Sequence, residues 1–234
     1  MLTKTPEATP EQNQYRIESQ MQMNMQGSMQ GKGSMKTTGC FADAVRGLLS
    51  ESSTLNTIVN KVALNNGIKG KAIATGPDLS DLDAPMNLEY SWEGQNLLHR
   101  NEDDILFQVP VAVDFFTSQF FVQYLSSEPR KYPLIIGASI YEWDHSIALP
   151  VNYQIKKPLP SIRLVNPAGS YIATYKEENG SLQVHRILTL KKNVYPAEEY
   201  VHVGMLIEQL LQDRSAIFSL SPVSSIKSNP TKQP

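Results

Sequence analysis

The chain has 234 residues and a formal net charge of −2, with 21 Lys and Arg against 23 Asp and Glu. A balance so close to zero gives no electrostatic attraction for nucleic acid or for an anionic membrane surface, so neither is expected as a partner. The single cysteine excludes a framework of disulfides within the chain. No stretch has about 18 or more consecutive apolar residues, so no membrane span is predicted.

Both ends of the chain are polar and contain proline. Such segments have little apolar surface to bury, so residues 1–14 are expected to form a disordered arm and residues 222–234 a disordered tail. The amino-terminal segment lacks the apolar core of a signal peptide, so none is predicted.

The first structured segment is predicted from YRIESQMQMNM, whose apolar residues all fall on one parity from Tyr15 onward. A period of two predicts a half-buried strand of an antiparallel sheet, with its methionines in the core. After a turn at QGS, the segment MQGKGSMKTTG is expected to be the partner strand. Its glycines favour a position near a sheet edge.

Two helices are predicted next. Apolar residues at helical spacing predict one helix over residues 41–50 and a second over residues 54–66. Ser53 or Thr54 is expected to cap the second helix, and Gly67 to end it in a left-handed conformation.

From Ile68 onward the pattern is mainly that of strands. Alternation in PMNLEYSWEG and DILFQVPVAV predicts two of them, and SQFFVQYL and the segments after it are expected to add at least four more. EENGS predicts an Asn-Gly hairpin turn. Pro196 and the acids behind it predict a helix over residues 197–213, and AIFSLS a closing strand.

Strands and helices do not alternate regularly, which argues against a doubly wound parallel sheet. The predicted fold class is therefore mainly β (α+β): an antiparallel β-sandwich with an inserted helical pair near the N-terminus and one helix near the C-terminus. A polar stretch around Pro129 predicts a boundary between two subdomains. Residues 15–128 would form a β-rich subdomain with the helical pair, and residues 129–221 a C-terminal β-sandwich subdomain with the last helix.

Cys40 is the candidate nucleophile. It follows Gly39 and opens a predicted helix, whose free N–H groups lower the pKa of a thiol. Catalysis would also need a histidine as base and an acid or amide to orient it. Of the four histidines, only His145 and His185 lie on predicted strands, and neither is expected to reach Cys40. We therefore favour a small structural residue at a helix start, and Cys40, His145 and His185 are kept as catalytic candidates only.

No metal site and no cofactor site is predicted. No two histidines stand four residues apart, and one cysteine cannot make a CxxC pair. Asp144 and His145 are the closest metal candidate, but on a strand they would point to opposite faces. The acidic run 102–104 lacks the glycine and distal glutamate of a calcium loop. GKGSMKTTG does not match a phosphate-binding loop.

Aromatic side chains suggest a further role. A carbohydrate or peptide platform needs exposed rings, whereas the period-two placement of most of these residues favours core packing. The residues are Tyr90, Trp92, Phe115, Phe116, Phe120, Phe121, Tyr141 and Trp143.

Four motifs then carry a family resemblance. The first, Gly-x-x-Ala-x-x-x-Arg at the start of the predicted helix, is followed by Arg-x-Tyr-Pro-Leu, by ALPVNYQIKKPLP and by YPAEEY after a hairpin. They resemble the β-rich region that follows the transglutaminase-like core in large bacterial proteins, which also carry an N-terminal domain of unknown function. The likeness spans most of residues 15–221. The matching residues are Gly39, Ala42, Arg46, Arg130, Tyr132, Pro133, Leu134, Leu149, Pro150, Tyr153, Ile155, Leu159, Pro160, Arg186, Leu188, Val194 and Tyr200.

The resemblance implies a non-catalytic β-sandwich accessory module with a role in domain docking or in substrate or partner presentation. Its partner would be a transglutaminase-like domain in the same or another chain, and the catalytic core would lie upstream of residue 1. It implies a periplasmic or cell-envelope location, whereas the missing signal peptide leaves a cytoplasmic one open. Two alternatives stay open: a cysteine-dependent transglutaminase- or protease-like enzyme using Cys40, and a carbohydrate- or peptide-binding module.

Overall fold

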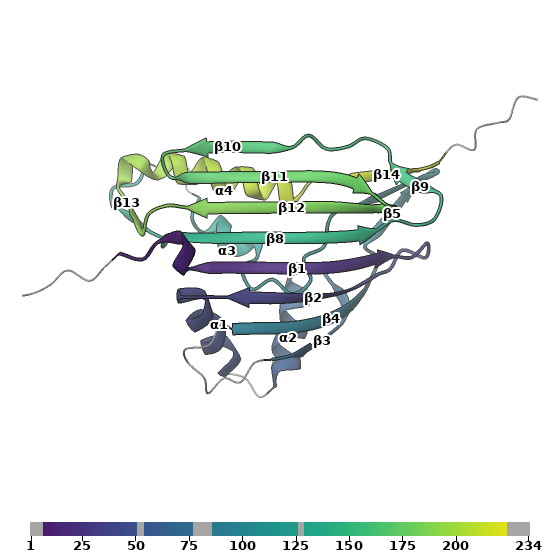
Figure 1. The fold of residues 1–234 in the computed structure, drawn as a ribbon, viewed down its shortest axis with the longest axis horizontal. Coiled ribbons are helices and arrows are strands. Elements are labelled where there is room, and N and C mark those ends of the chain that lie inside the picture. The colour runs from purple at the N-terminus through teal and green to yellow at the C-terminus, as the bar shows by residue number, and fades with distance from the viewer. Residues whose placement is uncertain (1–6, 51–53, 77–85, 126–128, 224–234) are drawn as a thin grey trace, which may run out of the picture.

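An eight-stranded sheet organises the chain (Figure 1). The computed structural model describes residues 7–50, 54–76, 86–125 and 129–223. The strands of this sheet lie in the order β10-β11-β12-β8-β1-β2-β4-β3. Their bounds are β1 (Gln14–Met23), β2 (Met29–Thr37), β3 (Lys69–Thr75), β4 (Met86–Gln95), β8 (Ser139–Ala148), β10 (Ile162–Asn166), β11 (Gly169–Glu178) and β12 (Ser181–Leu190).

The centre of the sheet is a parallel pair. β1 runs parallel to β8, with Tyr15 opposite Tyr141, whereas the other neighbouring strands of this sheet are antiparallel. The strand predicted from Tyr15 onward as part of an antiparallel sheet is therefore antiparallel to β2 and parallel to β8. This pair joins strands from the ranges 15–128 and 129–221, so the two predicted subdomains share one sheet. That the two ranges form separate subdomains stays a prediction.

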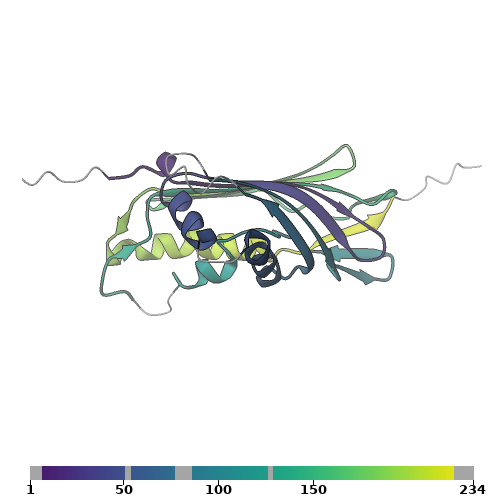
Figure 2. The same cartoon turned by 90° about the horizontal axis from the view of Figure 1, so that it is seen from below.

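The helices and two smaller sheets lie on one side of the large sheet (Figure 2). The helices are α1 (Cys40–Ser50), α2 (Leu55–Asn65), α3 (Ser118–Val122) and α4 (Tyr200–Arg214), with short 3-10 turns at Pro10–Gln12 (η1) and Ala197–Glu199 (η2). The smaller sheets are β5-β6-β14-β9 and β13-β7. Their strands are β5 (Leu98–Asn101), β6 (Asp104–Phe107), β7 (Leu134–Ile135), β9 (Tyr153–Ile155), β13 (Val194–Tyr195) and β14 (Phe218–Pro222).

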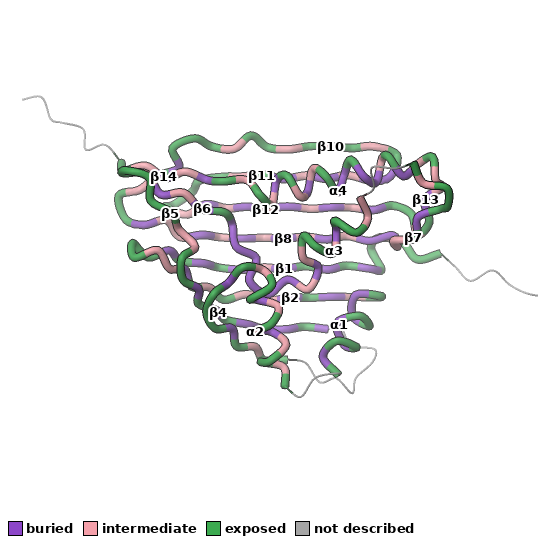
Figure 3. Tube along the Cα trace, turned by 180° about the vertical axis from the view of Figure 1, so that it is seen from behind, coloured by how far each residue is buried: buried purple, intermediate pink, exposed green. Residues whose placement is uncertain are grey.

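The core lies between the large sheet and this second layer. Burial alternates along the long strands, as the colours of Figure 3 show, because successive side chains point to opposite faces. The predicted alternation and the mainly β, α+β fold class are confirmed. None of the helices in the described ranges is both long and apolar enough to cross a membrane.

Core packing is also the role of the aromatic residues. The buried rings are Tyr90, Trp92, Phe116, Phe121, Tyr141 and Trp143, while Phe115 and Phe120 are partly buried against them. Phe41, Phe116 and Phe121 make edge-to-face contacts with Tyr141 at centroid distances of 4.9, 5.7 and 5.2 Å. These rings fill the core, so they offer no exposed platform.

β2 was predicted to lie near a sheet edge, and it is the third strand from the β3 edge, between β1 and β4. Its glycines leave room for aromatic rings of the neighbouring strand. A Cβ atom at Gly31 would lie 2.7 Å from Nε1 of Trp92, and one at Gly33 would lie 2.6 Å from the hydroxyl of Tyr90. The rings thus cover the glycines on the core side.

Two segments predicted as strands have other structures. Residues 108–116 leave the strand after Phe107, and Pro110 cannot donate a ladder hydrogen bond. SQFFVQYL forms α3 because the hydroxyl of Thr117 accepts a hydrogen bond from the Phe120 amide (3.4 Å) and caps the turn. The helix then buries Phe121 completely.

Other local predictions are confirmed. α1 and α2 lie within one residue of the predicted ranges, and the helix predicted over residues 197–213 consists of η2 followed by α4. Thr54 caps α2 by accepting from the Thr57 amide. The β11–β12 hairpin turns at Asn179 and Gly180, with φ angles of 52° and 72°. α2 also protects the β3 edge of the sheet: Asn60 exchanges hydrogen bonds with the backbone of Ala72 (2.9 and 2.7 Å).

Part of the arm predicted to be disordered, residues 1–14, has regular structure in the described residues. Pro10–Gln12 form η1, and Asn13 is buried. The Asn13 side chain donates to the carbonyl of Ala138 (2.9 Å) and accepts from the Cys40 amide (3.0 Å), so it joins β1 to β8 and to α1. Residues 1–6 of the predicted arm and 224–234 of the predicted tail lie outside the described residues.

Candidate functional site

The face of the large sheet opposite the helices carries a trough. Six strands contribute outward side chains to it, and its volume is about 650 Å³. A second hollow of about 830 Å³ adjoins it and shares Gln20 and Lys32 with it. Polar side chains therefore line a long open surface. One representative from each strand is Glu18, Lys32, Thr75, Glu89, Asp144 and His185.

A charged cluster stands in the wall of the trough, where β12, β8 and β1 are neighbours. His185 lies opposite Asp144 in the β12–β8 ladder, and its Nδ1 is 2.6 Å from Oδ1 of that carboxylate and 3.9 Å from Oε1 of Glu142. Arg16 approaches the other oxygens of the same carboxylates, with Nη2 3.0 Å from Oδ2 of Asp144 and Nη1 3.7 Å from Oε2 of Glu142. Arg16 Nε also contacts Glu18 at 2.8 Å.

His145 lies directly behind this cluster, on the core side of β8. Its Nδ1 is 2.6 Å from Oγ of Ser19, and both side chains are buried. Burial, and then the charges of Arg186 and Arg214, lower the pKa of His145 to about 3, so the ring is neutral. Asp144 and His145 thus point to opposite faces, as predicted.

Cys40 lies on the helical side of the sheet, at the first residue of α1. Gly39 before it has a φ of 57°, and a Cβ at Gly39 would lie 2.2 Å from Oδ1 of Asn13. The glycine therefore makes room for the asparagine that caps α1. Partial enclosure, and then the charge of Asp43, raise the pKa of the Cys40 thiol. Its local environment disfavours the thiolate that a nucleophile needs.

The three candidate residues are not brought together. Cys40 begins α1, His145 is bonded to Ser19 in the core, and His185 is on the opposite face of the sheet beside Asp144. Within the described ranges no hydrogen bond joins Cys40 to either histidine. Cys40, His145 and His185 stay catalytic candidates only, and this geometry does not favour a site shared by the three.

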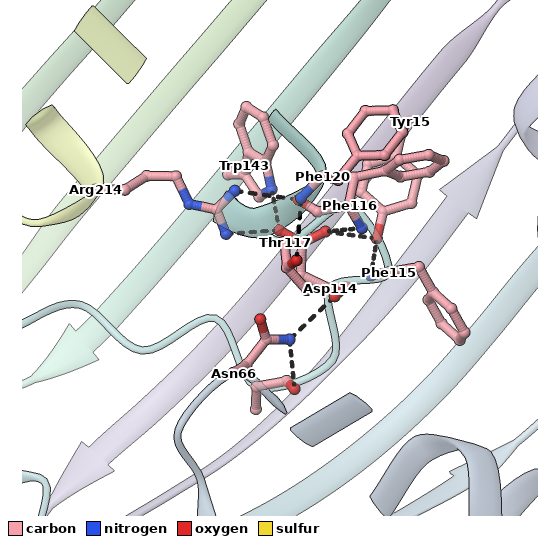
Figure 4. Close-up of polar contacts among 10 residues, drawn as sticks. Tyr15, Asn66, Asp114, Phe115, Phe116, Thr117, Phe120, Trp143 and Arg214 are labelled. Atoms are coloured by element: carbon pink, nitrogen blue, oxygen red, sulfur yellow. Dashed lines mark hydrogen bonds and ion pairs between the residues drawn. The ribbon is translucent and has the colours of Figure 1, made fainter. Parts of the chain in front are cut away.

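A buried carboxylate, Asp114, connects the sheet to the helices (Figure 4). It is fully buried, and its oxygens accept from the Tyr15 hydroxyl (2.9 Å), the Trp143 indole (3.2 Å) and the Phe116 amide (2.9 Å). Arg214, at the end of α4, donates to Oδ2 from Nη2 at 2.7 Å. Every one of these contacts lies in the core, so Asp114 has a structural role.

A second buried pair stands one residue away on α4. Arg186 of β12 donates from Nε to Oδ2 of Asp213 at 2.6 Å, and the Tyr171 hydroxyl donates to the same oxygen at 2.5 Å. The Tyr175 hydroxyl donates to the other oxygen of Asp213. The two buried ion pairs, Arg214–Asp114 and Arg186–Asp213, connect the end of α4 to the sheet. The sequence analysis predicted neither of these two networks.

The chemistry of the chain thus divides between two faces. The core side holds buried charges that are paired with one another, whereas the open side holds a solvent-facing trough with a cluster of ionisable groups. The second arrangement can bind an extended polar partner or a cation.

Residues 103–220 match DUF3858, a family described as a domain of unknown function with a solved structure. No curated protein matches the chain. The matched range contains Asp114, Glu142, Asp144, His185 and Asp213, whereas Arg16 and Cys40 precede it. It spans half of the sequence, and the chain therefore belongs to the DUF3858 family.

Proposed function

We propose that this chain is an accessory docking module that receives a partner on the open face of its large sheet. The partner class is a transglutaminase-like domain, as the motif resemblance implies, in the same or another chain. The module does not carry out catalysis itself in this proposal. It holds the partner or presents a substrate to it.

One observation carries this proposal. The large sheet has a helical layer on one face, while the other face is a trough of about 650 Å³ lined from six strands. An antiparallel sheet commonly packs one face and solvates the other. What distinguishes the open face here is that it is hollowed, with side chains of six strands lining the hollow. Here the lining mixes Ser, Gln, Glu and Lys side chains, which suit hydrogen bonding to another polar surface.

The test measures binding to a separately produced transglutaminase-like domain by isothermal titration calorimetry. Lys32→Glu and Glu89→Lys reverse charges in the trough, and each should weaken binding by about tenfold or more, since like-charge contacts oppose association. Lys61→Glu on α2 and Glu208→Lys on α4 are matched controls, because both are exposed outside the trough. Both controls should bind as the wild type does.

Two results would contradict the proposal. One is the absence of binding by the wild-type chain, and the other is equal binding by the trough variants and the controls. Binding of an oligosaccharide or a peptide in the same trough, without binding of the protein domain, would instead support the carbohydrate- or peptide-binding alternative.

A further inference from the structure

We infer that Glu142, Asp144 and His185 form a binding site for a divalent transition-metal ion of the zinc class. The site lies on the open face of the sheet and does not depend on the docking role proposed above. It is built from one imidazole nitrogen and two carboxylate oxygens, which are ligands that Zn²⁺ takes in proteins.

The three donor atoms converge. Nδ1 of His185, Oδ1 of Asp144 and one oxygen of Glu142 all lie within 4.8 Å of one another. In a tetrahedral zinc site with bonds of about 2.0–2.1 Å, two ligand atoms are about 3.3 Å apart. The observed separations of 2.6 Å to Asp144 and 3.9 Å to Glu142 fall on either side of that value. Small rotations of exposed side chains therefore bring all three donors to an ion.

Arg16 is placed as a supporting residue. It contacts Oδ2 of Asp144 and Oε2 of Glu142, whereas the atoms that face His185 are Oδ1 and Oε1. Arg16 thus holds each carboxylate from one side. Oδ1 of Asp144 accepts a hydrogen bond from Nδ1 of His185, and a bound ion would take the place of the proton between these two atoms. Ligating carboxylates in metal sites are commonly hydrogen-bonded in this way by neighbouring groups.

The charge of the cluster favours a dication. Glu18, Glu142 and Asp144 carry three negative charges, and within the contacts that join this group Arg16 supplies one positive charge. Lys36 is the next cation along the sheet, opposite Arg16 in β2. The three carboxylates and Arg16 together leave two negative charges, which one divalent ion neutralises.

The backbone holds the ligands in register. Asp144 and His185 are direct partners in the β8–β12 ladder, and both strands lie inside the eight-stranded sheet. Ligands on paired interior strands keep their spacing better than ligands on loops. Three protein ligands leave at least one coordination position, and that position opens into the trough, where Asp144 and His185 form part of the wall.

The experiment titrates Zn²⁺ into the full chain after treatment with a chelator, and follows the heat by calorimetry. Co²⁺ serves as a spectroscopic probe, because ligation gives it visible absorption bands that depend on its ligands. We expect one equivalent of each ion to bind. His185→Gln and Asp144→Asn each remove one ligand and should weaken binding tenfold or more. His99→Gln, an exposed histidine of β5, is the matched control and should bind as the wild type does.

Circular dichroism of each variant checks the fold, and because His185 and Asp144 are only partly buried, both variants are expected to fold. Absence of saturable binding in the wild type overturns the inference. Binding that is unchanged in both ligand variants also overturns the inference. Loss of binding in the His99→Gln control does so as well. A failure of the docking test leaves this result unaffected, since the two experiments use different ligands.

Discussion

Arg214 reaches from the last turn of α4 to the fully buried carboxylate of Asp114, and its Nη2 lies 2.7 Å from Oδ2. The pair ties the C-terminal helix to a loop between β6 and α3 and to two aromatic residues of the sheet, Tyr15 and Trp143. A buried ion pair of this kind is costly to break, because removing one partner leaves the other charge without compensation.

We therefore expect Asp114→Ala to lower the free energy of unfolding by about 3–5 kcal/mol. Urea unfolding followed by tryptophan fluorescence measures this value, since Trp143 is itself a partner of the carboxylate. Glu208→Ala, on the exposed side of α4, serves as the control and should stay within about 0.5 kcal/mol of the wild type. A loss below 1 kcal/mol for Asp114→Ala would show that the pair is not a main tie of the fold.

Two glycines should respond to alanine with opposite signs. At Gly33 a Cβ would lie 2.4 Å from the Glu18 carbonyl and 2.6 Å from the Tyr90 hydroxyl, so Gly33→Ala should cost about 1–3 kcal/mol. At Gly47, which is exposed in α1, a Cβ meets nothing within 4 Å. Gly47→Ala should stabilise the protein by about 0.5–1 kcal/mol, because alanine loses less conformational entropy in a helix. Thermal unfolding of both variants gives the two signs, and equal shifts would contradict the role assigned to Gly33.

Much of the fold could be predicted from local pattern. The alternation from Tyr15 onward and the helical spacing around Val45 each fix one buried face, and both faces are found in the core. The failures arose where contacts distant in sequence decide the outcome. The glycines of β2 suggest an edge until the rings of Tyr90 and Trp92 are known to cover them.

The site was harder to predict for the same reason. Asp144 and His145 are adjacent in sequence, so their opposite directions follow from strand geometry alone. The contact between Asp144 and His185 depends on the register of β8 against β12. The alternation of apolar residues within each strand does not specify this register. Arg186 could have indicated a buried ion pair. It occupies an inward position of β12 among leucines and a valine, where a charge needs a buried partner.

Cys40 should behave as a slow thiol. Partial enclosure and the nearby Asp43 raise its pKa, so the thiolate is scarce at neutral pH. We expect its alkylation by iodoacetamide at pH 7 to be slower than that of a free cysteine and to rise with pH until the thiol ionises. Cys40→Ser should change the free energy of unfolding by about 1 kcal/mol or less. Rapid alkylation at pH 7 would favour the cysteine-dependent enzyme.

The imidazole of His145 gives the stability of the fold a dependence on pH. Its pKa is lowered to about 3 by burial and by Arg186 and Arg214, whereas in the unfolded chain it returns to about 6.5. Between these two values the unfolded chain binds one more proton at this residue than the folded chain does. Stability from this source is therefore complete above pH 6.5 and is lost progressively as the pH falls toward 3.

We expect His145→Gln to remove this dependence, because glutamine does not titrate and can still form a hydrogen bond with Ser19. The slope of unfolding free energy against pH, measured in urea between about pH 6 and pH 4, should be shallower in the variant by about 1.4 kcal/mol per pH unit, the value for one proton. The comparison uses slopes, so a lower stability of the variant at neutral pH does not affect it. His99→Gln, exposed in β5, should keep the wild-type slope. If His145→Gln also keeps the wild-type slope, the imidazole of His145 is protonated in the folded protein. The neutral state assigned to this buried ring would then be wrong.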